Sequence, residues 1–125
     1  MKKFFIFMVV LLIISSGFSL TKNDYREVMS DPVNKIGSIY SIFGTVQQIV
    51  YEKDVHVYFI NTSYDTIFIL LVNQGEMEYV MKKEYVLIYN AVFLGAFTYS
   101  SVGKGAITAP AFYFKKDISV CFLSD

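Results

Sequence analysis

Blocks of β-branched and aromatic residues, separated by short polar breaks, make up most of the chain after Gly37. Such blocks predict β-strands, because these side chains pack well on a pleated surface. The breaks suit antiparallel hairpins and are too short for crossover helices. We therefore expect an all-β fold with one sheet that is antiparallel throughout. Its five predicted strands are residues 38–51, 55–61, 66–73, 84–100 and 106–120.

Two glycines interrupt the longest of these blocks. Gly44 lies in the first predicted strand and Gly95 in the fourth, which is long for a single strand. Glycine inside a strand is typical of a bulge or a sharp bend. Strands bent in this way favour closure of the sheet into a small barrel.

A helical pattern precedes the strands. Over residues 21–35 the apolar positions recur at helical spacing, and Thr21 or Asn23 can cap the start. These positions are Tyr25, Val28, Met29 and Val33. Because Pro32 disfavours helical geometry in the residue before it, we expect the helix to break or end at Asp31.

The first nineteen residues have the pattern of a secretory signal. Lys2 and Lys3 precede an apolar run over residues 4–14, and Gly17 and Ser19 provide small residues for cleavage. We expect cleavage after Ser19, with cleavage after Gly17 as an alternative, and one domain over residues 20–125. The predicted location is periplasmic or secreted, with membrane contact only before cleavage. An uncleaved anchor in the inner membrane is the alternative, although the run is shorter than the roughly 20 residues of a comfortable span.

The charge balance argues against a nucleic-acid partner. The whole chain has 11 basic and 11 acidic residues, and loss of Lys2 and Lys3 would leave a net charge of −2. Nucleic-acid binders are usually basic, because phosphate contacts supply most of their non-specific affinity. Nucleic acid is therefore an unlikely ligand of the exported domain.

The run Gly103-Lys104-Gly105 resembles part of a phosphate-binding loop but lacks its other residues. Thr98 stands where such a loop has its first glycine, and Gly105 stands where it has a hydroxyl residue. The run also joins two predicted strands instead of a strand and a helix. We expect a hairpin turn in which both glycines have positive φ and Lys104 lies at the tip.

No set of residues predicts catalysis, a metal site or a cofactor. His56 is the single histidine and has no Cys, His or carboxylate at the spacing of a metal site or a catalytic triad. Glu76 and Glu78 read as a solvated turn. Cys121 is the single cysteine, so an internal disulfide is impossible, and its apolar surroundings indicate a small buried hydrophobe. We expect the protein not to be an enzyme.

Several runs, in their order along the chain, resemble small exported bacterial OB-fold domains related to tRNA-anticodon-binding-like sequences. The matching runs are Asp31-Pro32, Lys35-Ile36-Gly37, residues 42–49, residues 95–101, Gly103-Lys104-Gly105 and Ile107-Thr108-Ala109-Pro110. The chain departs from the family at residues 82–84, where Lys-Lys-Glu replaces an acidic-Gly-Asp turn, and at Asn90, where the family has glycine. It also lacks room for a full helix between the third and fourth strands, and the leading helix could close one end of the barrel instead.

The resemblance implies a five-stranded antiparallel OB-fold Greek-key barrel with a short N-terminal α-helix. OB-folds bind ligands on their second and third strands, between the loops that follow the first and fourth strands. On that basis the candidate ligand-binding residues are Tyr51, Tyr58, Tyr64, Phe68, Tyr99 and Lys104. The expected function is an exported binding module of the cell envelope, with a glycan, peptide or protein as its partner. A single-stranded nucleic-acid binder is the alternative, and an enzyme is a more distant one.

Overall fold

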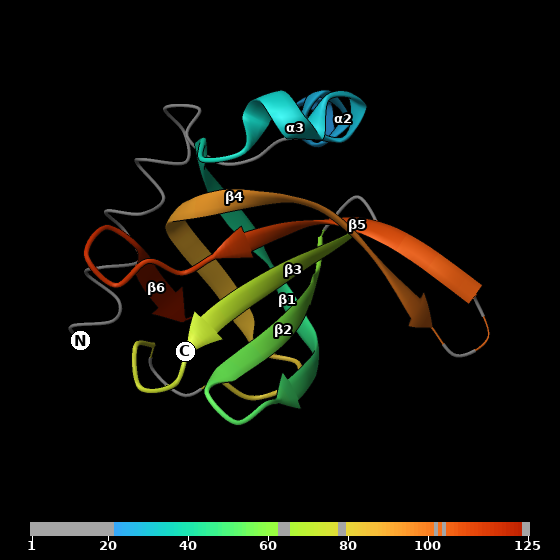
Figure 1. The fold of residues 1–125 in the computed structure, drawn as a ribbon. Coiled ribbons are helices and arrows are strands. Elements are labelled where there is room, and N and C mark those ends of the chain that lie inside the picture. Colours follow the sequence, from blue (N-terminus) through green and yellow to red (C-terminus); the bar gives the residue numbers. More distant parts are fainter. Residues whose placement is uncertain (1–21, 63–65, 78–79, 102, 104, 124–125) are drawn as a thin grey trace.

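Six strands and two short helices make up the computed structural model of the chain, which describes residues 22–62, 66–77, 80–101, 103 and 105–123 (Figure 1). The helices are α2 (Lys22–Ser30) and α3 (Pro32–Lys35). The strands are β1 (Ile39–Tyr51), β2 (Val55–Asn61), β3 (Ile67–Asn73), β4 (Tyr85–Ser101), β5 (Gly105–Tyr113) and β6 (Val120–Leu123). The expected signal segment and its cleavage sites lie outside the described residues.

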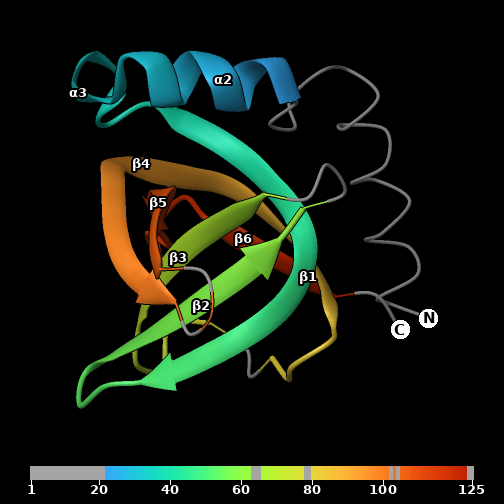
Figure 2. The same cartoon turned by 90° about the vertical axis from the view of Figure 1, so that its right-hand side faces the viewer.

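The strands form a sheet that closes on itself. Its order is β1-β2-β3-β5-β4-β6, and β1 also pairs with β4, so β1, β2, β3, β5 and β4 form a ring (Figure 2). Strand β6 adds to the far side of β4. The expectation of an all-β fold closed into a barrel is confirmed.

The expectation that every strand pair is antiparallel is wrong, because β3 and β5 run parallel. Ile69, Leu70 and Leu71 of β3 pair with Ala111, Phe112 and Tyr113 of β5. A closed ring with an odd number of strands cannot alternate direction all the way round. With β4 antiparallel to both β1 and β5, the one parallel pair falls between β3 and β5.

The predicted fifth strand, residues 106–120, divides into β5 and β6. Ser119 holds the turn between them, since its buried hydroxyl accepts from the Lys115 N–H at 2.9 Å and donates to the Asn90 carbonyl at 2.6 Å. Beyond this turn β6 pairs with residues 86–89 of β4. Val86, Leu87 and Ile88 thus lie between β1 on one side and β6 on the other.

Strand β1 pairs with β4 along its first half and with β2 along its second half. At the crossing, a Cβ on Gly44 would lie 2.7 Å from Ile60 Cγ2 and closer still to the Asn61 carbonyl oxygen, so only glycine fits. A bulge follows between Val46 and Gln48. Gly95 marks a second bend, with a φ of +129° beside the register shift between Phe93 and Gly95.

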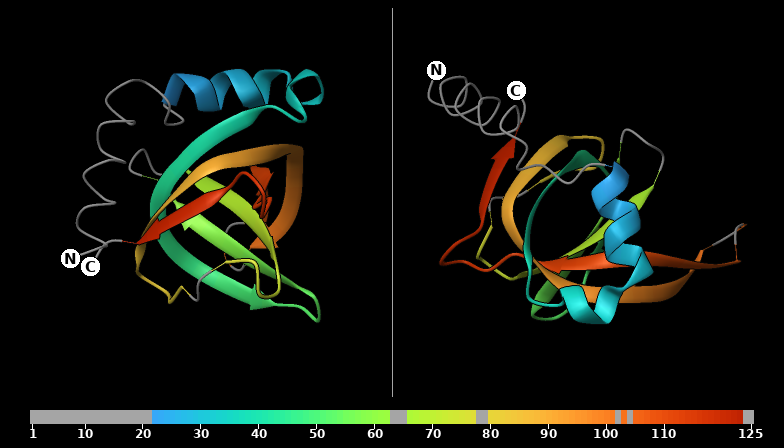
Figure 3. Two further views of the ribbon diagram at one scale, coloured as in Figure 1. Left: turned by 90° about the vertical axis from the view of Figure 1, so that its left-hand side faces the viewer. Right: turned by 90° about the horizontal axis from the view of Figure 1, so that it is seen from above.

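The predicted N-terminal helix is divided at Asp31 into α2 and α3. Both helices lie over one end of the barrel (Figure 3). Val28 is buried in the core, and the Tyr25 ring lies 5.8 Å from that of Phe68. Val33 is 74% exposed, so the apolar stripe ends with α2. No helix among the described residues is long and apolar enough to cross a membrane.

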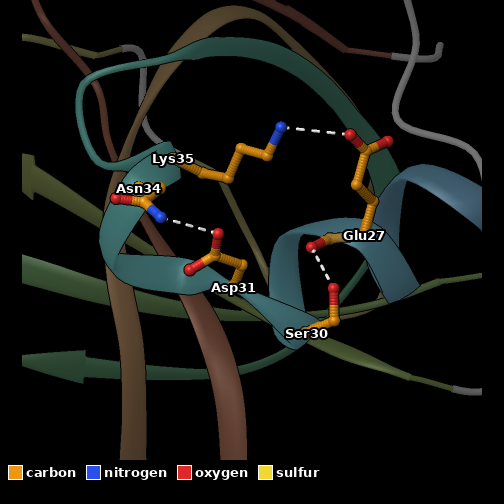
Figure 4. Close-up of polar contacts among 5 residues, drawn as sticks. All are labelled: Glu27, Ser30, Asp31, Asn34 and Lys35. Atoms are coloured by element: carbon orange, nitrogen blue, oxygen red, sulfur yellow. Dashed lines mark hydrogen bonds and ion pairs between the residues drawn. The ribbon is translucent and has the colours of Figure 1, made fainter.

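Polar contacts tie α2 to α3 around this break (Figure 4). The Asn34 amide donates to the Asp31 carboxylate at 2.7 Å, and Lys35 Nζ lies 3.0 Å from Glu27 Oε1. The hydrogen bond to Glu27 raises the pKa of Lys35.

The barrel interior is filled by apolar side chains from every strand of the ring together with Val28. Among the largest fully buried residues are Phe68, Phe93, Phe112, Ile42, Ile60, Leu70 and Ile88. The Phe112 ring meets that of Phe68 edge to face and that of Phe93 at a tilt, with centroids 5.5 Å apart in each pair.

Candidate functional site

Beyond Gly95, β4 and β5 continue as a two-stranded extension that reaches out from the barrel (Figure 1). We call residues 96–101 and 105–110 the arm. Gly103 and Gly105 have φ of +83° and +71°, which confirms the expected positive-φ glycines of the turn. Lys104, the expected tip residue, lies outside the described residues.

A second apolar cluster lies on the outer face of the sheet at the base of the arm. Its buried members are Ile69, Ala109 and Ala111. Val57, Phe59, Leu71, Leu94 and Tyr99 pack against them while half-buried. This cluster anchors the arm to the barrel, because Tyr99 of β4 packs against side chains of β2 and β3.

A cleft of about 370 Å³ opens between the arm and the barrel. We call it the arm cleft. It is lined by Gln47 and Gln48 of β1, Phe59 of β2, Ile67 of β3, Lys82 of the loop before β4, Tyr99 and Ser101 of β4, and Ile107 of β5. All five strands of the ring and the loop before β4 thus contribute side chains to the arm cleft.

Two aromatic rings, together with Ile67 and Ile107, form the apolar part of the arm cleft. The Phe59 and Tyr99 centroids lie 5.1 Å apart, with their planes inclined at 58°. Burial raises the pKa of the Tyr99 hydroxyl, and the protonated hydroxyl can donate a hydrogen bond. The pair combines a flat apolar surface with one donor.

Amide, hydroxyl and ammonium groups form the polar part. The bulge in β1 turns the consecutive residues Gln47 and Gln48 toward the cleft, which a regular strand could not do because neighbouring side chains point to opposite faces. Lys82 is held nearby because Lys83 donates its N–H to the Val46 carbonyl at 2.7 Å. Among the residues that the structure describes, Lys82 is the one charged member of the lining.

A smaller hollow of about 300 Å³ adjoins the arm cleft and shares Lys82 with it. Ile49, Tyr51 and Met81 form the rest of its lining. Tyr51 is 51% exposed, and its ring meets the His56 ring edge to face at 4.8 Å. Of the six candidates proposed from sequence, Tyr99 thus lines the arm cleft and Tyr51 its neighbour.

The other four candidates are not seen in the lining of either hollow. Tyr58 and Phe68 are 2% and 1% exposed and belong to the barrel core, so they lie where a ligand cannot reach them. The proposal of these two as ligand-binding residues is corrected on that ground. Tyr64 and Lys104 lie outside the described residues.

Seven lining residues of the arm cleft were not among the sequence candidates: Gln47, Gln48, Phe59, Ile67, Lys82, Ser101 and Ile107. Strands β2 and β3 are apolar on both faces, so alternation alone does not show whether Tyr58 or Phe59 points inward. The pair of glutamines within an otherwise apolar strand was a usable signal, since two adjacent polar residues there suggest a bulge that opens to solvent.

No group of three or more His, Cys, Asp and Glu side chains is placed to hold a metal ion within the described part of the chain. His56 packs between Tyr51 and Tyr58. Cys121 is partly buried against the core.

Comparison of the chain with protein-family models, with curated proteins and with solved structures finds no match.

Proposed function

We propose that the protein is an exported binding module of the cell envelope, built on an OB-fold, and that it holds its ligand in the arm cleft. The ring order β1-β2-β3-β5-β4 supports the OB-fold assignment. So does the place of the cleft, on the outer face of β2 and β3 and below the β4–β5 hairpin, where OB-folds bind their ligands. The basic start and apolar run at residues 2–14 support export.

The contact of Phe59 with Tyr99 carries the proposal. Both rings are half-buried on the outside of the barrel, apart from the barrel core, and both border an open hollow. Exposed aromatic surface beside convergent polar groups is typical of ligand sites. A glycan ring or an apolar peptide side chain fits the rings, and the two glutamines and Ser101 can pair with hydroxyl or amide groups of the same ligand.

The test is capture of the ligand with matched tyrosine variants. The exported protein is immobilised and incubated with detergent-solubilised envelope of the cells that make it, and bound glycans and proteins are identified by mass spectrometry. We expect Tyr99→Ala to reduce recovery of the parent's ligand by about tenfold, the equivalent of about 1.4 kcal/mol.

Tyr85→Ala is the control. Tyr85 is 54% exposed and stacks on Phe43 with centroids 6.1 Å apart. Like Tyr99→Ala, the Tyr85→Ala change removes one tyrosine–phenylalanine contact, but Tyr85 does not line the arm cleft. If Tyr99→Ala recovers as much ligand as the parent, or if both variants lose it equally, the arm cleft is not the binding site.

A further inference from the structure

The edge of β4 along the arm leaves a row of backbone groups without a strand beside it. Among the described residues, the stretch from Ala96 to Ser101 pairs with β5 alone, whereas earlier parts of β4 pair with strands on both sides. A two-stranded hairpin of this kind is marginally stable in water, and a strand edge is a template for another strand.

This edge also lacks the features that usually keep strands apart. Proteins protect exposed edges with charged residues or proline. The stretch Ala96-Phe97-Thr98-Tyr99-Ser100-Ser101 contains neither. The corresponding stretch of β5 carries Pro110, which has no N–H to offer a further strand. The two edges of the arm therefore differ, and the β4 edge is the one open to pairing.

Exposed apolar side chains lie where this edge begins. Phe97 is 47% exposed and Ile36 54% exposed, and a Cβ on Gly95 would lie 3.8 Å from both side chains. Both side chains therefore lie next to Gly95, on the side where its Cβ would be. A strand added along β4 would cover apolar surface at the base of the arm in addition to pairing its backbone.

We propose that a second copy of this chain occupies the β4 edge, giving a dimer whose two arms join into a four-stranded antiparallel ribbon. This inference goes beyond the proposed function, because it concerns the unpaired backbone edge of β4 and not the hollow of the arm cleft, with Tyr99 and Ser101 belonging to both. Two hydroxyl residues of the edge, Thr98 and Ser100, can pair with each other between two antiparallel copies. With a two-fold axis at Tyr99, Thr98 faces Ser100 of the partner, and Phe97 faces Ser101 of the partner.

Thr98 and Ser100 make this register testable. Both are exposed and lie on the face of the arm turned away from the cleft, because residues two apart share a face and Tyr99 and Ser101 line the cleft. In the dimer their hydroxyls meet across the axis twice, and Thr–Ser pairs of this kind stabilise antiparallel strands. The small net charge of the chain leaves little repulsion between copies.

The experiment is sedimentation velocity of the exported protein, recovered after expression of the full chain, from about 1 µM to about 1 mM. We expect a monomer–dimer equilibrium in this range. Thr98→Lys should raise the dimer dissociation constant by about tenfold or more. Thr98→Lys combined with Ser100→Glu should restore it, because each lysine then faces a glutamate of the partner.

Thr108→Lys is the matched control. Thr98 and Thr108 are both exposed and share one hydrogen bond, with their Oγ atoms 2.7 Å apart, so either change removes the same contact within the arm. Only Thr98 lies on the β4 strand, and Thr108→Lys should leave dimerisation within about twofold of the parent.

A parent that stays monomeric over the whole range would overturn the proposal. So would equal effects of Thr98→Lys and Thr108→Lys, or a Thr98→Lys/Ser100→Glu protein that remains as weak as Thr98→Lys. Thermal unfolding of each variant shows that it is folded. Loss of dimerisation with ligand capture intact would separate this result from the proposed function of the arm cleft.

Discussion

Lys83 and Asn90 adopt left-handed backbone conformations, with φ of +72° and +61°. These are the two positions where the OB-fold domains that the sequence resembles have glycine. Asparagine tolerates this region better than most side chains. Asn90 also gains a contact there, because its amide donates to the Ile118 carbonyl at 3.0 Å. Lysine has no such tolerance, so the backbone at Lys83 is strained.

Replacing Lys83 by glycine should therefore stabilise the protein. We expect Lys83→Gly to raise the free energy of unfolding by about 1 kcal/mol, since the strain of a left-handed residue exceeds the entropy that glycine adds to the unfolded chain. Urea unfolding measures the change. Lys83→Ala should give no such gain because alanine keeps the strain, and a gain equal to that of glycine would show that the side chain, not φ, is responsible.

At the scale of elements, α2 packs on the barrel core with Val28 and Tyr25. Val28 is 1% exposed within the core cluster. We expect Val28→Ala to lower the free energy of unfolding by about 2 kcal/mol, through lost burial and the cavity left behind. Thermal or urea unfolding with a helix-sensitive probe measures it.

Val33→Ala makes the same change on α3, where the side chain is exposed, and should alter stability by no more than about 0.5 kcal/mol. Equal effects of the two substitutions would mean that α2 does not close the barrel as described.

The elements themselves were largely predictable from local pattern. Breaks in apolar periodicity placed β2 and the ends of β1 and β4, and Pro32 placed the break between α2 and α3. The parallel pairing of β3 with β5 was not predictable from hairpin lengths, because it follows from closing the whole ring. Nor did pattern separate β6 from β5, since the turn between them depends on Ser119 and Asn90, which are far apart in sequence.

The candidate site was predicted only in part for a related reason. Tyr99 was found because it lies beside the glycine turn, and Tyr51 because it precedes a polar break. Tyr58 was placed on the surface although it lies in the core, because β2 is apolar on both faces and its alternation has no polar side to mark the outside. Lys82 reaches the cleft through the loop contact of Lys83 with Val46, which no spacing rule encodes.

At the scale of the whole molecule, the charge balance predicts behaviour toward nucleic acids. We expect no salt-sensitive binding of the exported protein to single-stranded DNA or RNA at micromolar concentration, because a net charge of −2 allows little counterion release. Polarisation titrations with labelled poly(dT) and poly(U) at low salt measure it. Micromolar binding that weakens steeply with added salt would favour the nucleic-acid alternative over an envelope ligand.

Strand β4 has a place in the ring that affects when the protein can fold. Val86, Leu87 and Ile88 pair on one side with β1 and on the other with β6, and neither strand is adjacent to β4 in sequence. Pairing between distant segments is slow, because the loops between them must close before the contacts form. Under the proposed export, a chain that crosses the membrane from its N-terminus delivers β6 last. The six-stranded sheet is then completed only after translocation has brought β6 across.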